Sequence, residues 1–267
     1  MESNNYYLAL GDEVDLDNKQ KVTKSAIKLL IVDIVLQICY LGYPLIAKLF
    51  TSQIIRLLII FGFTVFFGIF ANYFALTNKV FNKRLKQGKV IGLTIVFFFL
   101  LAIIVLMDFI YKSKMLHMSA FKVIGIIIVA LNAAICEEYL FRGILFNDIL
   151  LALHKNKYGI FWAASISSLF FSMIHLFNLT HQPLISTIGQ MIFAFNLGLM
   201  LCYLRLISNA MIWGILLHFW QDMSPQIATS NFGNSHVLDV IIVNGPVIIF
   251  MLVTIFAFNR RYLNLRK

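Results

Sequence analysis

The chain has 267 residues, of which 60% are hydrophobic and only 13% are charged. Soluble domains are about 45–50% apolar and about 25% charged, so this composition, with a mean hydropathy of +0.85, excludes an ordinary soluble protein and predicts an integral membrane protein. The net charge of +10 does not indicate a nucleic-acid partner, because no soluble face with clustered Lys and Arg lies between the apolar segments.

The chain begins with a short polar segment, residues 1–25, in which the first 18 residues are polar and acidic. This segment lacks the basic start and the small-residue cleavage site of a secretory signal, so we expect a cytoplasmic tail. Residues 26–267 contain no internal repeat and no loop long enough for a soluble domain. We therefore expect one polytopic membrane domain there.

Eight apolar segments follow the tail, and most have the length of about 20 residues that crosses a bilayer as a helix. The fold class predicted from them is an all-α integral membrane protein with eight transmembrane helices in one bundle. The predicted spans are Ile27–Ile46, Ile54–Leu76, Val90–Ile110, Phe121–Phe141, Ile160–Leu179, Leu184–Leu206, a shorter one at Ser208–Asp222, and Val237–Phe258.

Charge distribution predicts the orientation of the bundle. Of the 22 Lys and Arg residues, sixteen fall in segments on the same side as both termini, Arg205 among them, and five fall on the opposite side. Cytoplasmic loops collect Lys and Arg. Both termini are therefore expected in the cytoplasm.

The fourth apolar segment ends in CEEYLFRG, which contains Glu137, Glu138 and Arg142. A charged group at mid-bilayer costs roughly 2.5–3.5 kcal/mol. Glu138 and Arg142 are four residues apart and share a helix face, so they can form an ion pair. Glu137 lies about 140° from Arg142 around a helix and must face something else.

Two histidines also lie in apolar spans. His175 ends FFSMIH in the fifth span, and His218 with Asp222 forms an i, i+4 pair in ILLHFWQD of the seventh. Carboxylates and imidazoles on three helices are suited to activating a water and stabilising an oxyanion. A polar network that only holds the bundle together is the alternative that the residues leave open.

Three short motifs in this order resemble the CPBP family (CAAX protease and bacteriocin-processing, or Abi) of intramembrane glutamic endopeptidases, which includes CAAX prenyl protease 2-like proteins. The resemblance covers residues 121–225 and implies an eight-helix membrane protein that hydrolyses peptide bonds. The motif residues are Glu137, Glu138 and Arg142 in EExxxR, Phe171 and His175 in FxxxH, and His218 and Asp222 in HxxxD.

The resemblance also implies a role for each motif residue. Glu137 would be the general base, and His175 would help to place or deprotonate the water. His218 and Asp222 would stabilise the oxyanion, while the arginine of EExxxR would anchor the second glutamate. No cofactor is expected under this mechanism.

Asp222 departs from the commoner asparagine of the third motif. An ionised carboxylate cannot donate a hydrogen bond to an oxyanion, so Asp222 must be protonated, orient His218, or bind a metal. The last option keeps a zinc site open, with Glu137, His175, His218 and Asp222 as ligands. The absence of HExxH favours the metal-free mechanism.

Depth within the membrane adds one further expectation. Straight helices perpendicular to the bilayer would leave Glu137 and His175 too far apart to cooperate. We therefore expect the fourth helix to continue, tilted, from Phe121 to about Leu153, which places Glu137 at its midpoint.

The function predicted from these features is an intramembrane endopeptidase that acts on a membrane-associated or lipidated peptide. Its expected partners are membrane lipid and that peptide, with the oligomeric state left open. Self-immunity against a bacteriocin, or another non-enzymatic binding role in the same family, is the alternative. A proton-coupled transporter is a third class, but it would usually show a repeat symmetry that this sequence lacks. The Phe-, Ile-, Lys- and Asn-rich composition is typical of an AT-rich bacterial genome. We therefore expect a bacterial cell membrane.

Overall fold

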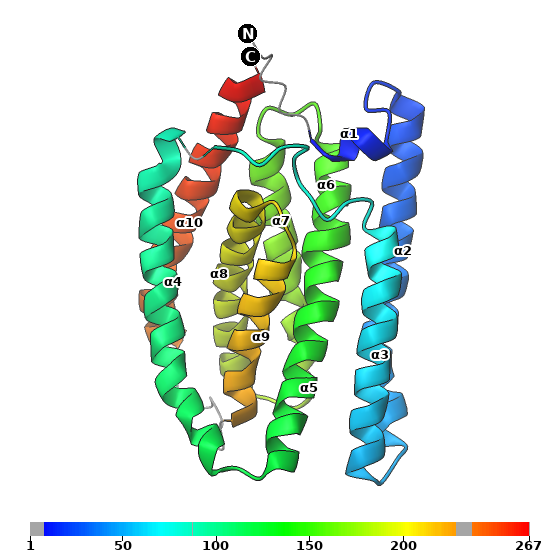
Figure 1. The fold of residues 1–267 in the computed structure, drawn as a ribbon, viewed down its shortest axis with the longest axis vertical. Helices are drawn as coiled ribbons and strands as arrows, with labels where there is room; N and C mark the ends of the chain where they lie inside the picture. Colours follow the sequence, from blue (N-terminus) through cyan, green and yellow to red (C-terminus); the bar gives the residue numbers. More distant parts are fainter. Residues whose placement is uncertain (1–7, 87, 228–236, 267) are drawn as a thin grey trace.

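The computed structural model describes residues 8–86, 88–227 and 237–266, and this part of the chain is helical without β-strands (Figure 1). Residues 1–7 of the predicted tail lie outside the described residues. The α-helices are α1 (Leu10–Glu13), α2 (Lys19–Lys48), α3 (Gln53–Phe74), α4 (Ile91–Lys112), α5 (Ala120–Glu137), α6 (Phe146–Ala152), α7 (Gly159–Met173), α8 (Leu184–Ser208), α9 (Ile212–Ile227) and α10 (Val237–Arg266).

Seven helical segments of the described residues are long and apolar enough to cross a membrane. They match seven of the eight predicted spans, and several extend further than predicted. The first begins at Lys19 because the side chain of Asn18 caps it, accepting hydrogen bonds from the backbone N–H groups of Gln20 and Lys21 at 3.1 and 3.2 Å.

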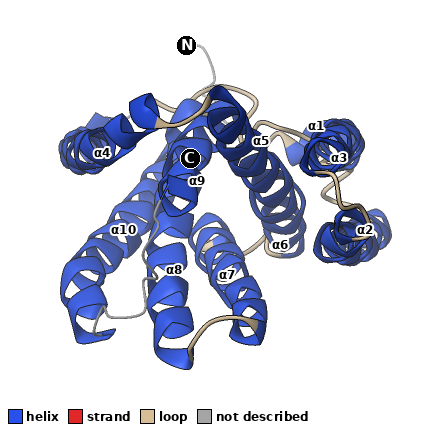
Figure 2. Ribbon diagram, turned by 90° about the horizontal axis from the view of Figure 1, so that it is seen from below, coloured by secondary structure: helices blue, strands red, loops and turns tan. Residues whose placement is uncertain are grey.

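The remaining predicted span, Ser208–Asp222, which is the seventh in chain order, corresponds to α9, which has 16 residues. At 1.5 Å per residue this helix is about 24 Å long, shorter than the hydrocarbon core of about 30 Å. Helix α9 packs against α4, α5 and α8 near the middle of the molecule (Figures 1 and 2). It is therefore a short helix between longer ones, with Ile212, Trp213 and Leu216 exposed on one face.

The longer helices form a shell around this centre. Helices α7, α8 and α10 stand side by side, the α2–α3 pair lies on one flank, and α4 lies on the other (Figure 2). The outer helices present large apolar side chains to the surroundings, among them Ile38, Phe66 and Phe99, each 65% exposed. Such surfaces are expected where lipid covers the protein.

The fourth span runs without interruption from Ala120 to Ala152, which confirms the expected continuation beyond Phe141. Its middle was not predicted, because Glu138–Leu145 forms a π-helix, η3, between α5 and α6. Single turns of π-helix are rare and frequently lie at functional sites. Here the wider turn begins at the second glutamate of the EExxxR motif.

Arg205 of α8 holds this wider turn. Its guanidinium donates to the backbone carbonyl of Arg142 and, at 2.9 Å, to Oδ1 of Asn147, and it lies over the ring of Phe146. The charge count assigns Arg205 to the cytoplasmic cations, but its side chain is buried inside the bundle. A buried arginine therefore supplies donors where the helix widens.

The start of α9 is fixed by the turn that precedes it. Asn209 adopts a left-handed conformation (φ 57°) at the end of α8, which asparagine tolerates better than most residues. Its Oδ1 accepts from the N–H groups of Val80 and Phe81 at 2.8 and 2.9 Å, and its Nδ2 donates to the carbonyl of Phe81. This turn is thereby fastened to the segment between α3 and α4.

Candidate active site

The polar site forms where α5 becomes the π-helix and meets α9. Both glutamates of the EExxxR motif point to the imidazole of His218. Nδ1 of His218 lies 2.9 Å from Oε1 of Glu138, and Nε2 lies 3.5 Å from Oε2 of Glu137. Two adjacent carboxylates therefore share one histidine, each facing a different ring nitrogen.

Glu138 is fully engaged and buried. Its side chain is 1% exposed, and its Oε1 lies 3.0 Å from Nη1 of Arg142 in the ion pair that the spacing predicts. An ionised carboxylate only accepts hydrogen bonds, so Nδ1 of His218 donates to it. Glu138 therefore has a buried cation and a ring N–H as partners.

A glycine on α9 permits this close approach. A Cβ atom placed on Gly214 would lie 3.0 Å from Oε2 of Glu138, a distance that real Cβ atoms rarely show. Any larger side chain would push α9 away from the π-helix. The glycine therefore sets how close the histidine of α9 comes to the glutamate.

Glu137 has a different environment. Its side chain is 12% exposed, and its Oε1 accepts a hydrogen bond of 2.6 Å from the hydroxyl of Tyr40 on α2. Its Oε2 faces Nε2 of His218. No basic side chain of Lys or Arg in the described residues forms an ion pair with Glu137, so it is less tightly engaged than Glu138.

Asp222 completes the group around His218. Its Oδ2 lies 3.4 Å from Nε2 of His218, and its side chain is 27% exposed. The i, i+4 pair expected on the seventh span is thus present. Among the roles considered for Asp222, this contact is the one expected of a residue that orients the imidazole.

His175 lies beside this group rather than in it. It sits in the 3-10 helix η4 (Ile174–Thr180) after α7, and its Nδ1 lies 3.0 Å from the carbonyl oxygen of Phe171. The ring of Phe171 packs edge-on against both His175 and His218, with centroids 5.4 Å apart in each pair. Within the described part of the chain, no hydrogen bond or ion pair joins His175 to Glu137.

The zinc site considered from the sequence stays a prediction. In the described residues, no group of three or more His, Cys, Asp or Glu side chains is arranged to hold a metal ion. Nδ1 of His218 faces Glu138 and Nδ1 of His175 faces a backbone carbonyl, so each ring has only Nε2 left for a further partner. No step is therefore derived through a metal.

The bonds from side chains of α2 and α3 to α5 at and beside this site are not predicted from the sequence. Tyr40 bonds Glu137, and Tyr43 donates to Oδ1 of Asn132 at 2.5 Å, while Nδ2 of Asn132 donates to Thr64 at 2.8 Å. The signal available was YLGY in an apolar span, because buried tyrosine hydroxyls usually find a partner. The sequence does not indicate which partner.

Comparison with protein families gives a match over residues 118–224 to the model of type II CAAX prenyl endopeptidases, described as Rce1-like. No curated protein and no solved structure matches the chain. The matched segment contains both glutamates, Arg142, both histidines and Asp222, and the match indicates a protease embedded in a membrane. Residues 118–224 are therefore similar to the Rce1-like family of type II CAAX prenyl endopeptidases.

Proposed function

We propose that this protein is an intramembrane endopeptidase that hydrolyses a peptide bond of a membrane-associated or lipidated peptide, with Glu137 activating the water. One observation carries the proposal: the two adjacent glutamates face one imidazole but differ in their other partners. Glu138 is buried in an ion pair with Arg142. Glu137 is partly exposed and has no Lys or Arg partner in the described residues. A general base needs access to water and a free lone pair.

The reaction follows from this difference. Oε2 of Glu137 takes a proton from water, and the water oxygen attacks the carbonyl carbon of the scissile bond. The tetrahedral oxyanion then collapses, the carbon–nitrogen bond breaks, and the leaving nitrogen takes the proton held by Glu137. The products are a carboxylate and an amine, and no covalent enzyme intermediate forms.

His218 is proposed to stabilise the oxyanion as an imidazolium, which donates from Nε2 while its Nδ1–H is held by Glu138. Asp222, at 3.4 Å from that Nε2, is proposed to orient the ring, because a carboxylate cannot itself donate to an oxyanion. His175 is proposed to place the attacking water. Its position in FxxxH and its packing on Phe171 support this role.

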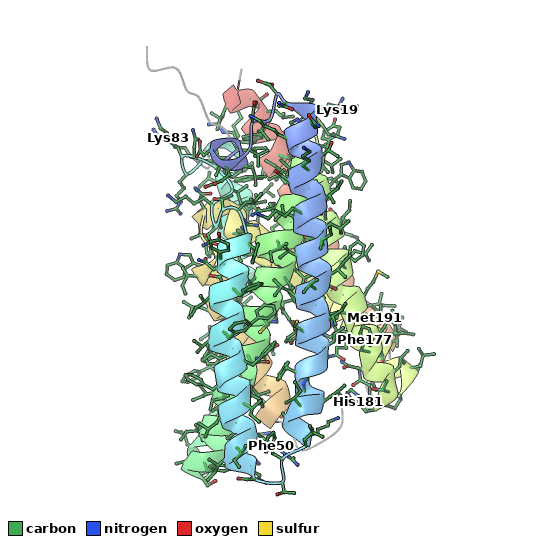
Figure 3. All side chains as sticks on the ribbon, turned by 90° about the vertical axis from the view of Figure 1, so that its right-hand side faces the viewer. Lys19, Phe50, Lys83, Phe177, His181 and Met191 are labelled. Atoms are coloured by element: carbon green, nitrogen blue, oxygen red, sulfur yellow. The ribbon has the colours of Figure 1, made fainter. Side chains whose placement is uncertain are left out.

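The proposed topology has eight spans with both termini in the cytoplasm, and α9 is the short seventh span. What supports it is the common location of the basic segments: the start of α2 with Lys19, the segment with Lys83, and the end of α10 all lie at one end of the molecule (Figures 1 and 3). Lys and Arg collect on the cytoplasmic side. A bacterial cell membrane remains part of this proposal.

A non-enzymatic role, such as self-immunity against a bacteriocin, is the second reading of the sequence. The family match names an endopeptidase and does not favour that reading. The non-enzymatic role predicts that cells with Glu137→Gln stay protected against the bacteriocin. The hydrolase predicts that this variant loses every effect that depends on cleavage.

The test uses the full-length protein in lipid nanodiscs with a quenched fluorogenic peptide that ends in a farnesylated CaaX sequence, the substrate class that the family description names. The same peptide without the lipid tests whether the lipid matters. Wild-type protein should cleave, and Glu137→Gln and His175→Ala should each lower kcat by about 10²–10⁴-fold. Asp239→Asn on α10, an exposed acid outside the site, is the matched control. Wild-type cleavage by folded Glu137→Gln would refute the assignment.

A further inference from the structure

Tyr40 lies on α2, outside the segment that matches the family model, yet its hydroxyl is 2.6 Å from Oε1 of Glu137. A carboxylate only accepts, so the phenol donates this hydrogen bond. The two residues are 97 positions apart in the chain. This contact is the shortest that the structure gives for the glutamate side chain.

The hydrogen bond from Tyr40 gives the two carboxylate oxygens of Glu137 different partners. Oε1 is held by Tyr40, while Oε2 faces Nε2 of His218 at 3.5 Å. Fixing one oxygen fixes the rotation of the carboxylate about its last side-chain bond. The oxygen that remains is then directed toward the side of the site where His218 and Asp222 lie.

The phenol itself is held by its neighbours. The centroid of its ring lies 6.3 Å from the ring centroid of Phe67, which is buried on α3, and 6.0 Å from that of Tyr43. Tyr43 stacks on Phe63 at 4.3 Å and bonds Asn132 of α5. Tyr40 is thus aimed at Glu137 by packing against the rings of Phe67 and Tyr43.

We propose that Tyr40 is a positioning residue for the reaction, which holds one oxygen of Glu137 so that the other meets the attacking water. The inference rests on the proposed function, because it assigns Glu137 as the base. It extends the site to a helix that lies outside the family segment. Near-attack geometry has large effects on rate, and a hydrogen bond to a charged group is among the stronger ones.

The test compares Tyr40→Phe with Tyr43→Phe in the nanodisc cleavage assay. Phenylalanine keeps the ring and removes only the hydroxyl. Tyr40→Phe should lower kcat on the order of 10- to 100-fold with KM within about twofold, since substrate contacts are unchanged. Tyr43→Phe removes the neighbouring bond to Asn132 and should leave kcat within about twofold.

An infrared readout separates positioning from general loosening. The difference between wild-type and Glu137→Gln spectra isolates the carboxylate stretch of Glu137, and Tyr40→Phe should shift this band while Tyr43→Phe should not. An unshifted band, an unchanged kcat, an equal loss in Tyr43→Phe, or failure of Tyr40→Phe to fold would each overturn the inference. If Glu137→Gln stays active, the proposed function fails; if it is inactive while Tyr40→Phe is fully active, only this inference fails.

Discussion

The two glutamates of the site should lose very different amounts of stability on the same change. Glu138→Gln removes the carboxylate that faces Arg142 at 3.0 Å and His218 at 2.9 Å, inside a region where the arginine is fully buried. Breaking a buried ion pair from one side costs about 3–5 kcal/mol, because an uncompensated charge stays behind. At about 2–4 °C per kcal/mol for a chain of roughly this length, the melting temperature should fall by about 6–20 °C.

Glu137→Gln should be far milder for stability. The amide oxygen of glutamine can still accept from Tyr40, and only the contact of 3.5 Å to His218 is weakened. We expect a loss of about 1 kcal/mol, which corresponds to roughly 2–4 °C. The two variants therefore differ in stability although they make the same chemical change at adjacent positions.

The assay is thermal unfolding in detergent or nanodiscs, followed by tryptophan fluorescence. Glu138→Gln combined with Arg142→Met serves as the control, because removing both charges should recover part of the loss. A Glu138→Gln protein as stable as wild type would contradict this reasoning. So would a Glu137→Gln protein that loses as much stability as Glu138→Gln.

Three further changes test how the helices position the site. Gly214→Ala should lower the melting temperature by the cost of overpacking, about 1–3 kcal/mol, and should lower kcat, because its Cβ would lie 3.0 Å from Glu138; an unchanged kcat would count against this. Asp222→Asn should keep cleavage within about tenfold of wild type, because the amide can still contact His218 and can donate, whereas Asp222→Ala should lose more in the same kcat measurement. Asn209→Gly should unfold closer to wild type than Asn209→Ala, since glycine tolerates the left-handed backbone; the reverse order in thermal unfolding would show that the backbone conformation does not matter.

The positions of the long helices could be predicted from the sequence because each is an apolar segment of the length that a bilayer requires. Local spacing also predicted the pairs within one helix. Glu138 with Arg142 and His218 with Asp222 are both present, since residues four apart on a helix are neighbours whatever surrounds them. The fourth helix continues past its apolar stretch as expected.

Contacts between helices could not be predicted in the same way. The bond from Tyr40 to Glu137 joins residues far apart in the chain, and no periodicity indicates such a pair. The charge count assigns Arg205 to the cytoplasmic side because it lies near the end of an apolar segment, yet it donates to Arg142 and Asn147 inside the bundle. The π-helix depends on such partners from other helices, so local sequence does not predict it.

The most direct test of the account follows the oxygen of the attacking water. A single turnover in water labelled with oxygen-18, with enzyme in excess over the fluorogenic peptide, is analysed by mass spectrometry of the new peptide carboxylate and of the enzyme peptide that contains Glu137. If Glu137 acts as a general base, the cleaved peptide carries one labelled oxygen and Glu137 carries none. Label found in Glu137, with unlabelled product, would show that Glu137 attacks the substrate itself and would contradict the mechanism.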